Sequence, residues 1–419
     1  MRTGGWTRYT AEVTALRESP VFRGTETADG AAPFDPPENA VPARIVRAAA
    51  QVKSTPGILW DVPGLTAHIG FLGRLLARHG LSMHCALKAC ASAPIVRLLR
   101  ETVRAADVAT AEELRLARSL GFSRISATGP AFAREQIPDL LAGGVLFDAQ
   151  SPVQLDQLLE QPFPAAAGGA VDWGVRVRVP LPDVLRSSTS RGQESRFGLV
   201  LDERLADRLR SAPQPVRRVR VHTGEVTPDL LAFRARYAVL VARLLGTVDQ
   251  INLGGGLLRL SRRPDLLDAT LRTIGAELRA YDGPELSVWM EPGAALTLDH
   301  AYLVTQVLDA DCASPHGQGV VVDASAWNLA PWAYPSFHPV ADASQVFTGD
   351  VFGPSLYEKD RFRRTARTPS ATRLAVGDRL LATSFGAYTL VHARQFGQLP
   401  VPDQYLVDDH GMERVDERP

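Results

Sequence analysis

The chain has 419 residues, more than one compact core usually holds, so two domains are expected. Hydrophobic residues make up 45% and charged residues 22%, which is ordinary for a globular protein. The 46 basic residues balance 46 acidic ones, and this neutrality argues against nucleic acid or an anionic membrane as the main partner.

Three cysteines, Cys85, Cys90 and Cys312, form no CxxC pair, which favours a reduced, cytoplasmic location. The first twenty residues lack the uninterrupted apolar core of a signal peptide. No apolar run reaches about 18 residues, so no membrane span is predicted. No metal site is predicted either.

Residues 22–42 are rich in Gly, Pro and acidic residues and are predicted to form a loop. Residues 1–42 as a whole are predicted to be an N-terminal segment that packs on a C-terminal domain. From Pro56 to residue 293, short β-rich apolar runs alternate with amphipathic helical stretches. The expected strands are GILWDV, LSMHCAL, ADVAT, SRISATG, VLFDA, VDWGVRVRVPL, VRRVRVHTG, VDQINLGGG and LSVWMEPG. Because this alternation is typical of parallel sheets, the pattern predicts an α/β fold, a (β/α)8 TIM barrel over 43–300.

The pattern changes after Ala301. The segments HAYLVTQVLDADC, GQGVVVDAS, DVFGPSL, RLAVGDRLLAT and GAYTLVHA predict antiparallel strands joined by turns, with few helices. Residues 301–419 are therefore expected to form a C-terminal β-domain, a sandwich or barrel.

Polar motifs stand directly after four of the predicted barrel strands. They are Lys88, His222, the run Gly254–Gly256, and Glu291. In a TIM barrel the carboxyl ends of the strands lie on one face, which is the face that carries the active site. These residues are therefore expected to meet.

Seven motifs in a fixed order carry a family resemblance. They are LKAC at 87–90, DVATAEEL at 107–114, HTG at 222–224, INLGGG at 251–256, EPG at 291–293, FGPS at 352–355, and GDRLL with GAYT within 377–389. The chain resembles the fold type III (alanine-racemase-like) pyridoxal-phosphate (PLP) decarboxylases, which include diaminopimelate and ornithine decarboxylases. The resemblance runs from about Pro56 to Phe396, nearly the whole chain.

The resemblance implies a PLP site. Lys88 would form a Schiff base with the cofactor on the second barrel strand, and Glu291 would keep the pyridine nitrogen protonated, which stabilises a carbanion. Gly254, Gly255 and Gly256 would bind the phosphate. His222 would stack on the cofactor ring.

Three further residues match family positions. Tyr388 would hydrogen-bond the phosphate from the β-domain. Asp107 would be an acid near the cofactor, although DVAT could equally cap a helix. Arg178, in VRVRV, would face the barrel interior. The family also implies a head-to-tail homodimer in which the partner's β-domain completes each active site.

The chain departs from the family at positions that bind the substrate or donate the proton. Leu356 occupies the position of the cysteine that donates a proton after CO2 leaves, and Tyr357 stands where an acid often recognises the substrate amine. Ala294 replaces the arginine of EPGR, and Ala330 lies near the position of a carboxylate-binding arginine. The aromatic residues around them line a less polar pocket or form β-domain core: Trp327, Trp332, Tyr334 and Phe337.

These features favour a PLP-dependent decarboxylase of an unusual amino acid, or an amino-acid conjugate, in a specialised biosynthetic pathway. Its catalytic residues would be Lys88, His222 and Tyr357, the last two or a water as proton donor. Three alternatives stay open: an amino-acid racemase or epimerase, a PLP-binding protein without activity, and a barrel protein without PLP. Glu291 argues against a racemase, because racemases of this fold place an arginine at the pyridine nitrogen.

Overall fold

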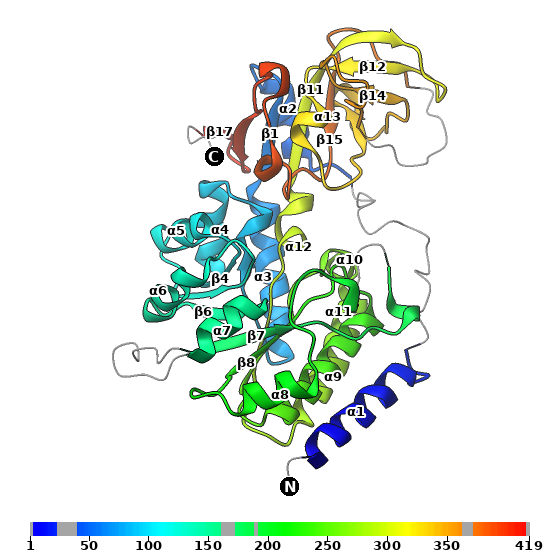
Figure 1. The fold of residues 1–419 in the computed structure, drawn as a ribbon. Coiled ribbons are helices and arrows are strands. Elements are labelled where there is room, and N and C mark those ends of the chain that lie inside the picture. Colours follow the sequence, from blue (N-terminus) through cyan, green and yellow to red (C-terminus); the bar gives the residue numbers. More distant parts are fainter. Residues whose placement is uncertain (1–2, 23–39, 161–171, 188–191, 363–371, 416–419) are drawn as a thin grey trace. The chain divides into compact units, whose positions relative to one another are not determined.

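The computed structural model describes residues 3–22, 40–160, 172–187, 192–362 and 372–415, and Figure 1 shows the course of the chain. Contacts divide the chain into two compact units. The first comprises Met1–Gly30, Phe71–Leu87 and Arg100–Pro292, and the second comprises Ala31–Gly70, Lys88–Leu99 and Gly293–Pro419.

The first unit is built on a parallel sheet that curls into a barrel. Its strands are short and almost wholly buried, as expected where helices cover the outer face of a parallel sheet. The strands are β2 (Leu81–Met83), β3 (Cys85–Ala86), β4 (Ala105–Val108), β5 (Arg124–Ala127), β6 (Leu146–Ala149), β7 (Trp173–Val177), β8 (Arg218–Val221), β9 (Gln250–Asn252) and β10 (Ser287–Met290).

The barrel closes on the segment that precedes Lys88. β2 pairs with β10, and β3 pairs with β4. Only His84 separates β2 from β3, and its N–H donates to the Met290 carbonyl at 2.9 Å. The two short strands are thus halves of one strand, and the sheet is an eight-stranded barrel among the described residues. The predicted (β/α)8 barrel with a following β-domain is confirmed.

Helices follow most barrel strands, and local sequence sets where they begin. Thr110, Asp202 and Thr227 cap three of them by accepting a hydrogen bond from the backbone N–H three residues on. The helices whose residues lie wholly or partly in this unit are α3 (Val62–Arg78), α4 (Ala93–Thr102), α5 (Ala111–Ser119), α6 (Ile137–Ala142), α7 (Pro152–Glu160), α8 (Glu203–Arg210), α9 (Pro228–Leu245), α10 (Leu258–Ser261) and α11 (Pro264–Arg279). No helix in the described residues is long and apolar enough to cross a membrane.

The second unit carries a mixed, mostly antiparallel sheet. Its order is β13-β15-β11-β1-β16-β17, and β12 pairs with β11 and β14. The strands are β1 (Gly57–Asp61), β11 (Ala301–Cys312), β12 (Gly319–Val322), β13 (Phe337–Pro339), β14 (Asp350–Phe352), β15 (Arg379–Ala382), β16 (Asp403–Val407) and β17 (Met412–Val415). The pairs β1–β16 and β12–β14 are parallel. The accompanying helices are α2 (Ala43–Gln51), α12 (Ala294–Thr297) and α13 (Ala326–Leu329).

Two predicted strands differ from the structure. β1, the GILWDV segment, pairs with β11 and β16 and is not a barrel strand. Its neighbour α2 buries Ile45 and Ala49 in the same core as Leu59. Lys88 therefore follows the first strand of the barrel in chain order, not the second. GAYTLVHA forms a turn and a single 3-10 turn at Leu390–His392.

The beginning of the chain packs on the barrel unit. Helix α1 (Thr3–Glu18) runs beside α9, as Figure 1 shows. The Tyr9 hydroxyl lies 3.3 Å from that of Tyr237, and the Phe22 ring meets Phe233 edge to face at 5.3 Å. The prediction that 1–42 pack on the β-domain is wrong for 3–22, while 23–39 lie outside the described residues. The boundaries at 42 and 300 stay a prediction.

We expect Phe22→Ala to lower the free energy of unfolding by about 2–4 kcal/mol, because it removes a buried ring from the contact with Phe233. Urea denaturation measures the loss. Its neighbour Val21 is exposed, so Val21→Ala should change stability by less than about 0.5 kcal/mol. Equal, small effects of the two substitutions would show that α1 is not anchored on α9.

Candidate active site

The centre of the barrel holds an arginine between two acids. On β8, Val219 and Val221 alternate with Arg218 and Arg220, so the arginines share one face of the strand. Arg220 binds Asp107 of β4 through Nη1 and Nη2, at 2.9 and 3.1 Å, and Nη2 lies 2.5 Å from Oε2 of Glu291. The structure therefore brings the predicted Asp107 and Glu291 together through a residue that we did not predict.

Glu291 is held at both oxygens. Oε1 accepts a hydrogen bond from Nδ2 of Asn252 at 2.5 Å, opposite the contact of Oε2 with Arg220. Burial raises the pKa of the Glu291 carboxyl, and Arg220 counters this by favouring the charged form. The result is an oriented carboxyl group immediately after β10, at the carboxyl end of the barrel.

A second arginine supports the same interior from one layer below. Arg218 donates from Nε to Asp148 at 2.7 Å, and from Nη1 to Asp172 at 2.7 Å and to Gln250 at 2.9 Å. Burial lowers the pKa of His84, whose ring stacks on Trp289, to about 3. His84 is therefore neutral and adds no further positive charge to this layer.

The predicted glycine run forms a tight turn beside His222. Gly254 and Gly256 have φ values of 67° and 90°, which only glycine adopts readily. The Gly255 N–H donates to Nδ1 of His222 at 3.2 Å, and the Gly254 N–H donates to Oδ1 of Asn252 at 2.8 Å. A Cβ on Gly256 would collide with the Gly224 carbonyl oxygen. The run thus packs closely on the HTG segment, and two of its N–H groups are already used.

The interior arginine of β7 is Arg176, two residues before the predicted Arg178. Burial lowers the pKa of Arg176 to about 10, and Arg220 acts in the same direction. Arg178 lies just beyond β7, where its Nε and Nη1 donate to the carbonyls of Gly198 and Gln193 at 2.9 and 3.1 Å. Arg178 therefore holds the 192–199 segment against the strand end.

Lys88 lies on the 3-10 turn Leu87–Ala89, directly after β3. The strand that leads to it is fixed, because the Ala86 N–H donates to the Pro292 carbonyl at 3.1 Å. Within the second unit, the Tyr388 N–H donates to the carbonyl of Ala89 at 2.8 Å. The backbone of Tyr388 is thus bonded to Ala89, the residue that follows Lys88 in the same 3-10 turn.

Tyr357 lies in an aromatic group of the second unit. Its ring centroid is 4.5 Å from that of Trp327, while the neighbouring Leu356 is fully exposed. Trp332 lies 4.5 Å from Tyr388, whereas Phe337 is buried against Phe362. The predicted aromatic set is therefore divided, with Phe337 in the core and both tryptophans beside predicted site residues.

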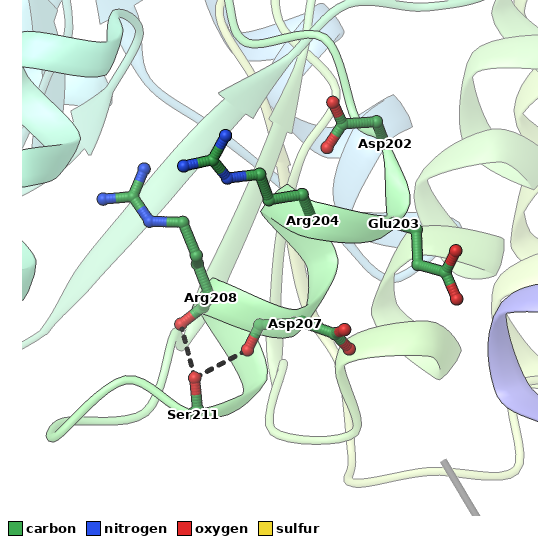
Figure 2. Close-up of a pocket in the computed structure, with 6 residues that line it drawn as sticks. All are labelled: Asp202, Glu203, Arg204, Asp207, Arg208 and Ser211. Atoms are coloured by element: carbon green, nitrogen blue, oxygen red, sulfur yellow. Dashed lines mark hydrogen bonds between the residues drawn. The ribbon is translucent and has the colours of Figure 1, made fainter. Parts of the chain in front are cut away.

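A surface pocket elsewhere on the barrel unit has a different character. Figure 2 shows its lining on α8 and its two ends: Asp202, Glu203, Arg204, Asp207, Arg208 and Ser211. Its polar groups make local contacts, such as Ser211 Oγ with the Asp207 carbonyl at 2.7 Å and Arg208 with Asp156 at 2.6 Å. None of the predicted site residues lines it.

Sequence reasoning missed Arg220, Arg218 and Asn252. The alternation of arginine and valine in RVRV was the available signal, because charged side chains on a buried strand must find partners in the interior. Asn252 was inside the quoted INLGGG motif but had no assigned role. Nothing near Arg218 in the sequence identifies Asp148 and Asp172 as its partners, because they lie 70 and 46 residues away along the chain.

The model described as "Pyridoxal-dependent decarboxylase, pyridoxal binding domain" matches residues 74–298, more than half of the chain. The chain therefore belongs to this family of PLP-dependent amino-acid decarboxylases, the group of ornithine, arginine and diaminopimelate decarboxylases, and its cofactor is pyridoxal 5'-phosphate.

Individual relatives agree with the family. The diaminopimelate decarboxylase of Helicobacter pylori is 24% identical over 389 residues, covering 88% of this chain and 94% of that protein. Its crystal structure with L-lysine has a TM-score of 0.73 at 20% identity, covering 88% and 95% of the two chains. The lysine decarboxylase of Selenomonas ruminantium has a TM-score of 0.70 at 20% identity, covering 88% and 97%. These structural similarities establish the fold.

We expect Arg220→Met to lower the free energy of unfolding by about 3–5 kcal/mol, because it leaves Asp107 and Glu291 buried without their cation. Chemical denaturation measures the change. The matched control is Arg217→Met, which breaks a partly exposed pair with Asp249 and should cost less than about 1 kcal/mol. Equal losses in the two variants would contradict a central role of Arg220.

Proposed function

We propose that the chain decarboxylates an unusual amino acid, or an amino-acid conjugate, in a specialised biosynthetic pathway. The observation that carries the proposal is the buried carboxyl group of Glu291, which Arg220 and Asn252 fix just beyond β10. A carboxylate in this environment suits a reaction that stabilises negative charge on the cofactor.

The residues present fit pyridoxal 5'-phosphate. The Lys88 amine would hold the aldehyde, Glu291 the pyridine nitrogen, and the turn Gly254–Gly256 the phosphate. The His222 ring, oriented by the Gly255 N–H, would lie against the cofactor ring. When bound, PLP takes up the electron pair that remains at Cα after CO2 departs. The N–H of Tyr388 binds the carbonyl of Ala89, next to Lys88, and its hydroxyl would donate a hydrogen bond to the phosphate.

Arg220 orients the Glu291 carboxyl group and favours its charged form. It supplies a positive charge on one side of the carboxyl group, while Asn252 donates on the other side. Because Arg220 is also bound to Asp107 at 2.9 Å, it stays in place when Glu291 exchanges a proton. Asp107 would thus act on the cofactor through Arg220.

Tyr357 is the proposed proton donor. Leu356, at the position where the family has a cysteine, has no proton to give. Burial raises the pKa of Cys90 to about 12 and that of Cys85 further, which makes both thiols weaker acids. The Tyr357 hydroxyl belongs to a ring ordered against Trp327, and a phenol can donate at neutral pH.

The proposed substrate class follows from two arginines of the family that this chain does not have. Ala294 and Ala330 replace two arginines of the family, so a second carboxylate on the substrate would have fewer cationic partners. Trp327 and Trp332 add apolar surface beside Tyr357 and Tyr388. These substitutions favour an amino acid whose far end is less polar than that of diaminopimelate. The head-to-tail homodimer with shared active sites and the cytoplasmic location stay predictions.

We expect the protein with PLP to release CO2 from at least one member of a panel of α-amino acids and conjugated diamino acids. Lys88→Ala should abolish release and the absorbance change on PLP addition, because the Lys88 amine is the proposed attachment point of the aldehyde. Lys53→Ala is the matched control and should behave as wild type. Absence of CO2 from every member of the panel would refute the proposed reaction.

We expect Tyr357→Phe to lower turnover at least about tenfold, because the ring stays and the proton is lost. If the partner subunit supplies Tyr357, mixing Lys88→Ala with Tyr357→Phe under subunit exchange should restore about one quarter of wild-type activity, since half of the dimers then hold one intact site. Activity is measured as CO2 release. No recovery on mixing, with exchange confirmed by mass, would contradict shared sites.

An amino-acid racemase or epimerase is the second candidate, and one observation favours it. Arg220 lies 2.5 Å from Oε2 of Glu291. The racemase reading requires that its charge offsets the negative charge of Glu291 more than it orients the carboxyl group, which would leave a weaker electron sink at the pyridine nitrogen. Exchange of the substrate Cα hydrogen for deuterium without CO2 release would support this candidate over decarboxylation.

A further inference from the structure

Arg234 is a fully buried arginine to which the reaction described above assigns no role. It lies in the second turn of α9, with none of its side chain exposed. Nη1 donates to the carbonyl of Gly255 at 3.0 Å. Nε and Nη2 have no hydrogen-bond partner within the described residues, and no ion pair of Arg234 occurs there.

A buried guanidinium with one partner is costly. Transfer of its charge from water costs several kcal/mol unless an anion and further hydrogen bonds offset it. Burial lowers the pKa of Arg234 to about 9, so the group still carries its charge at neutral pH. The charge and the unused N–H groups together indicate that Arg234 has an anionic partner from outside the chain.

The unused atoms form the edge of the guanidinium that binds anions elsewhere in this chain. Arg44 binds both oxygens of Asp61 through Nε and Nη2, at 2.6 and 3.0 Å. Arg217 binds Asp249 with the same two nitrogens. This edge presents two parallel N–H groups, which fit two oxygens of a carboxylate or a phosphate.

The hydrogen bond from Nη1 fixes the position of the Arg234 guanidinium. Its acceptor is the carbonyl of Gly255, in the middle of the turn Gly254–Gly256. Two N–H groups of this turn donate within the chain, to Asn252 and His222. The turn therefore supplies fewer free donors than its glycines suggest, and an anion there needs a cation. Thr223 lies in the segment against which the turn packs, and its buried Oγ1 also has no hydrogen-bond partner among the described residues.

The nearby acids do not take the place of that anion. Glu291 is already bound at both oxygens, by Arg220 and Asn252. Burial raises the pKa of Glu225 to about 8, so at neutral pH its carboxyl is largely protonated. Glu225 Oε1 accepts from the Arg259 N–H at 2.7 Å, which ties it to the start of α10.

We propose that Arg234 binds the phosphate group of pyridoxal 5'-phosphate through its Nε–Nη2 edge. The inference rests on the proposed placement of that phosphate at Gly254–Gly256. A substrate carboxylate has the same fork-shaped acceptor, so the test separates the cofactor phosphate from the substrate.

The test compares PLP with pyridoxal, which has the same ring and aldehyde but no phosphate. Apo-protein is titrated with each, and binding is followed by absorbance. We expect Arg234→Met to raise the Kd for PLP at least about tenfold and to leave the Kd for pyridoxal within about twofold. Arg234→Lys, which keeps a charge but loses the fork, should be intermediate for PLP. Arg243→Met, on the exposed side of the same helix, should match wild type.

Inorganic phosphate gives a second measurement. It should raise the Tm of the wild-type apo-protein and of Arg243→Met, but not that of Arg234→Met. If Arg234→Met does not fold, Arg234→Lys carries the test, with a weaker Kd for PLP and an unchanged Kd for pyridoxal.

Three outcomes would overturn the proposal. Equal loss of affinity for PLP and pyridoxal would indicate a purely structural role. Unchanged affinity for PLP with a raised KM for the amino acid would assign Arg234 to the substrate carboxylate. Unchanged affinity and KM would assign it to neither. Failure of the proposed decarboxylation is distinguishable, because it would show as bound PLP without CO2 release.

Discussion

The ion pairs of Arg220 with Asp107 and Glu291 are the interaction on which the rest of the barrel depends. Asp107 lies on β4, Arg220 on β8 and Glu291 directly after β10, so the pairs form only when these distant segments meet in the folded barrel. Removing two carboxyl groups from water is unfavourable, and the shared guanidinium offsets that cost. The site and the fold therefore share one electrostatic arrangement, and the orientation of Glu291 follows from it.

The interior of this barrel is polar in layers. Arg218 with Asp148 forms one layer, and Arg220 with Asp107 and Glu291 forms the next. Such interiors favour one particular packing arrangement more than they raise the free energy of unfolding, because each charge needs its own partner in the correct geometry. Arg234 of α9 is less completely paired than Arg218 and Arg220, since its Nε and Nη2 both have no partner in the described part of the chain. Where a buried network is incomplete, a ligand is the simplest way to complete it.

Motif spacing pointed to strand ends, because strand ends in a barrel converge whatever the helices between them are. In this way it singled out Glu291, which the structure places beside Asp107 and Arg220, while the role of Lys88 stays a prediction. Partners across the sheet could not be found in this way, since nothing near Arg220 in the sequence points to β4. The same limit explains β1, whose apolar run fits a barrel strand equally well but pairs with β11 and β16. Arg178 was predicted to face the interior and Arg176 was not considered, although both share one face of the strand and the sequence does not give depth.

The break between β2 and β3 at His84 has a consequence for the position of Lys88. The first half of the divided strand bonds to β10 and the second half to β4, so this strand is the seam at which the ring closes. The residue proposed to hold the cofactor follows the seam by two positions. The segment that leads to Lys88 is therefore held from both sides of the ring, by β10 and by β4. A substitution that weakens either pairing would displace this segment although it lies outside the proposed site.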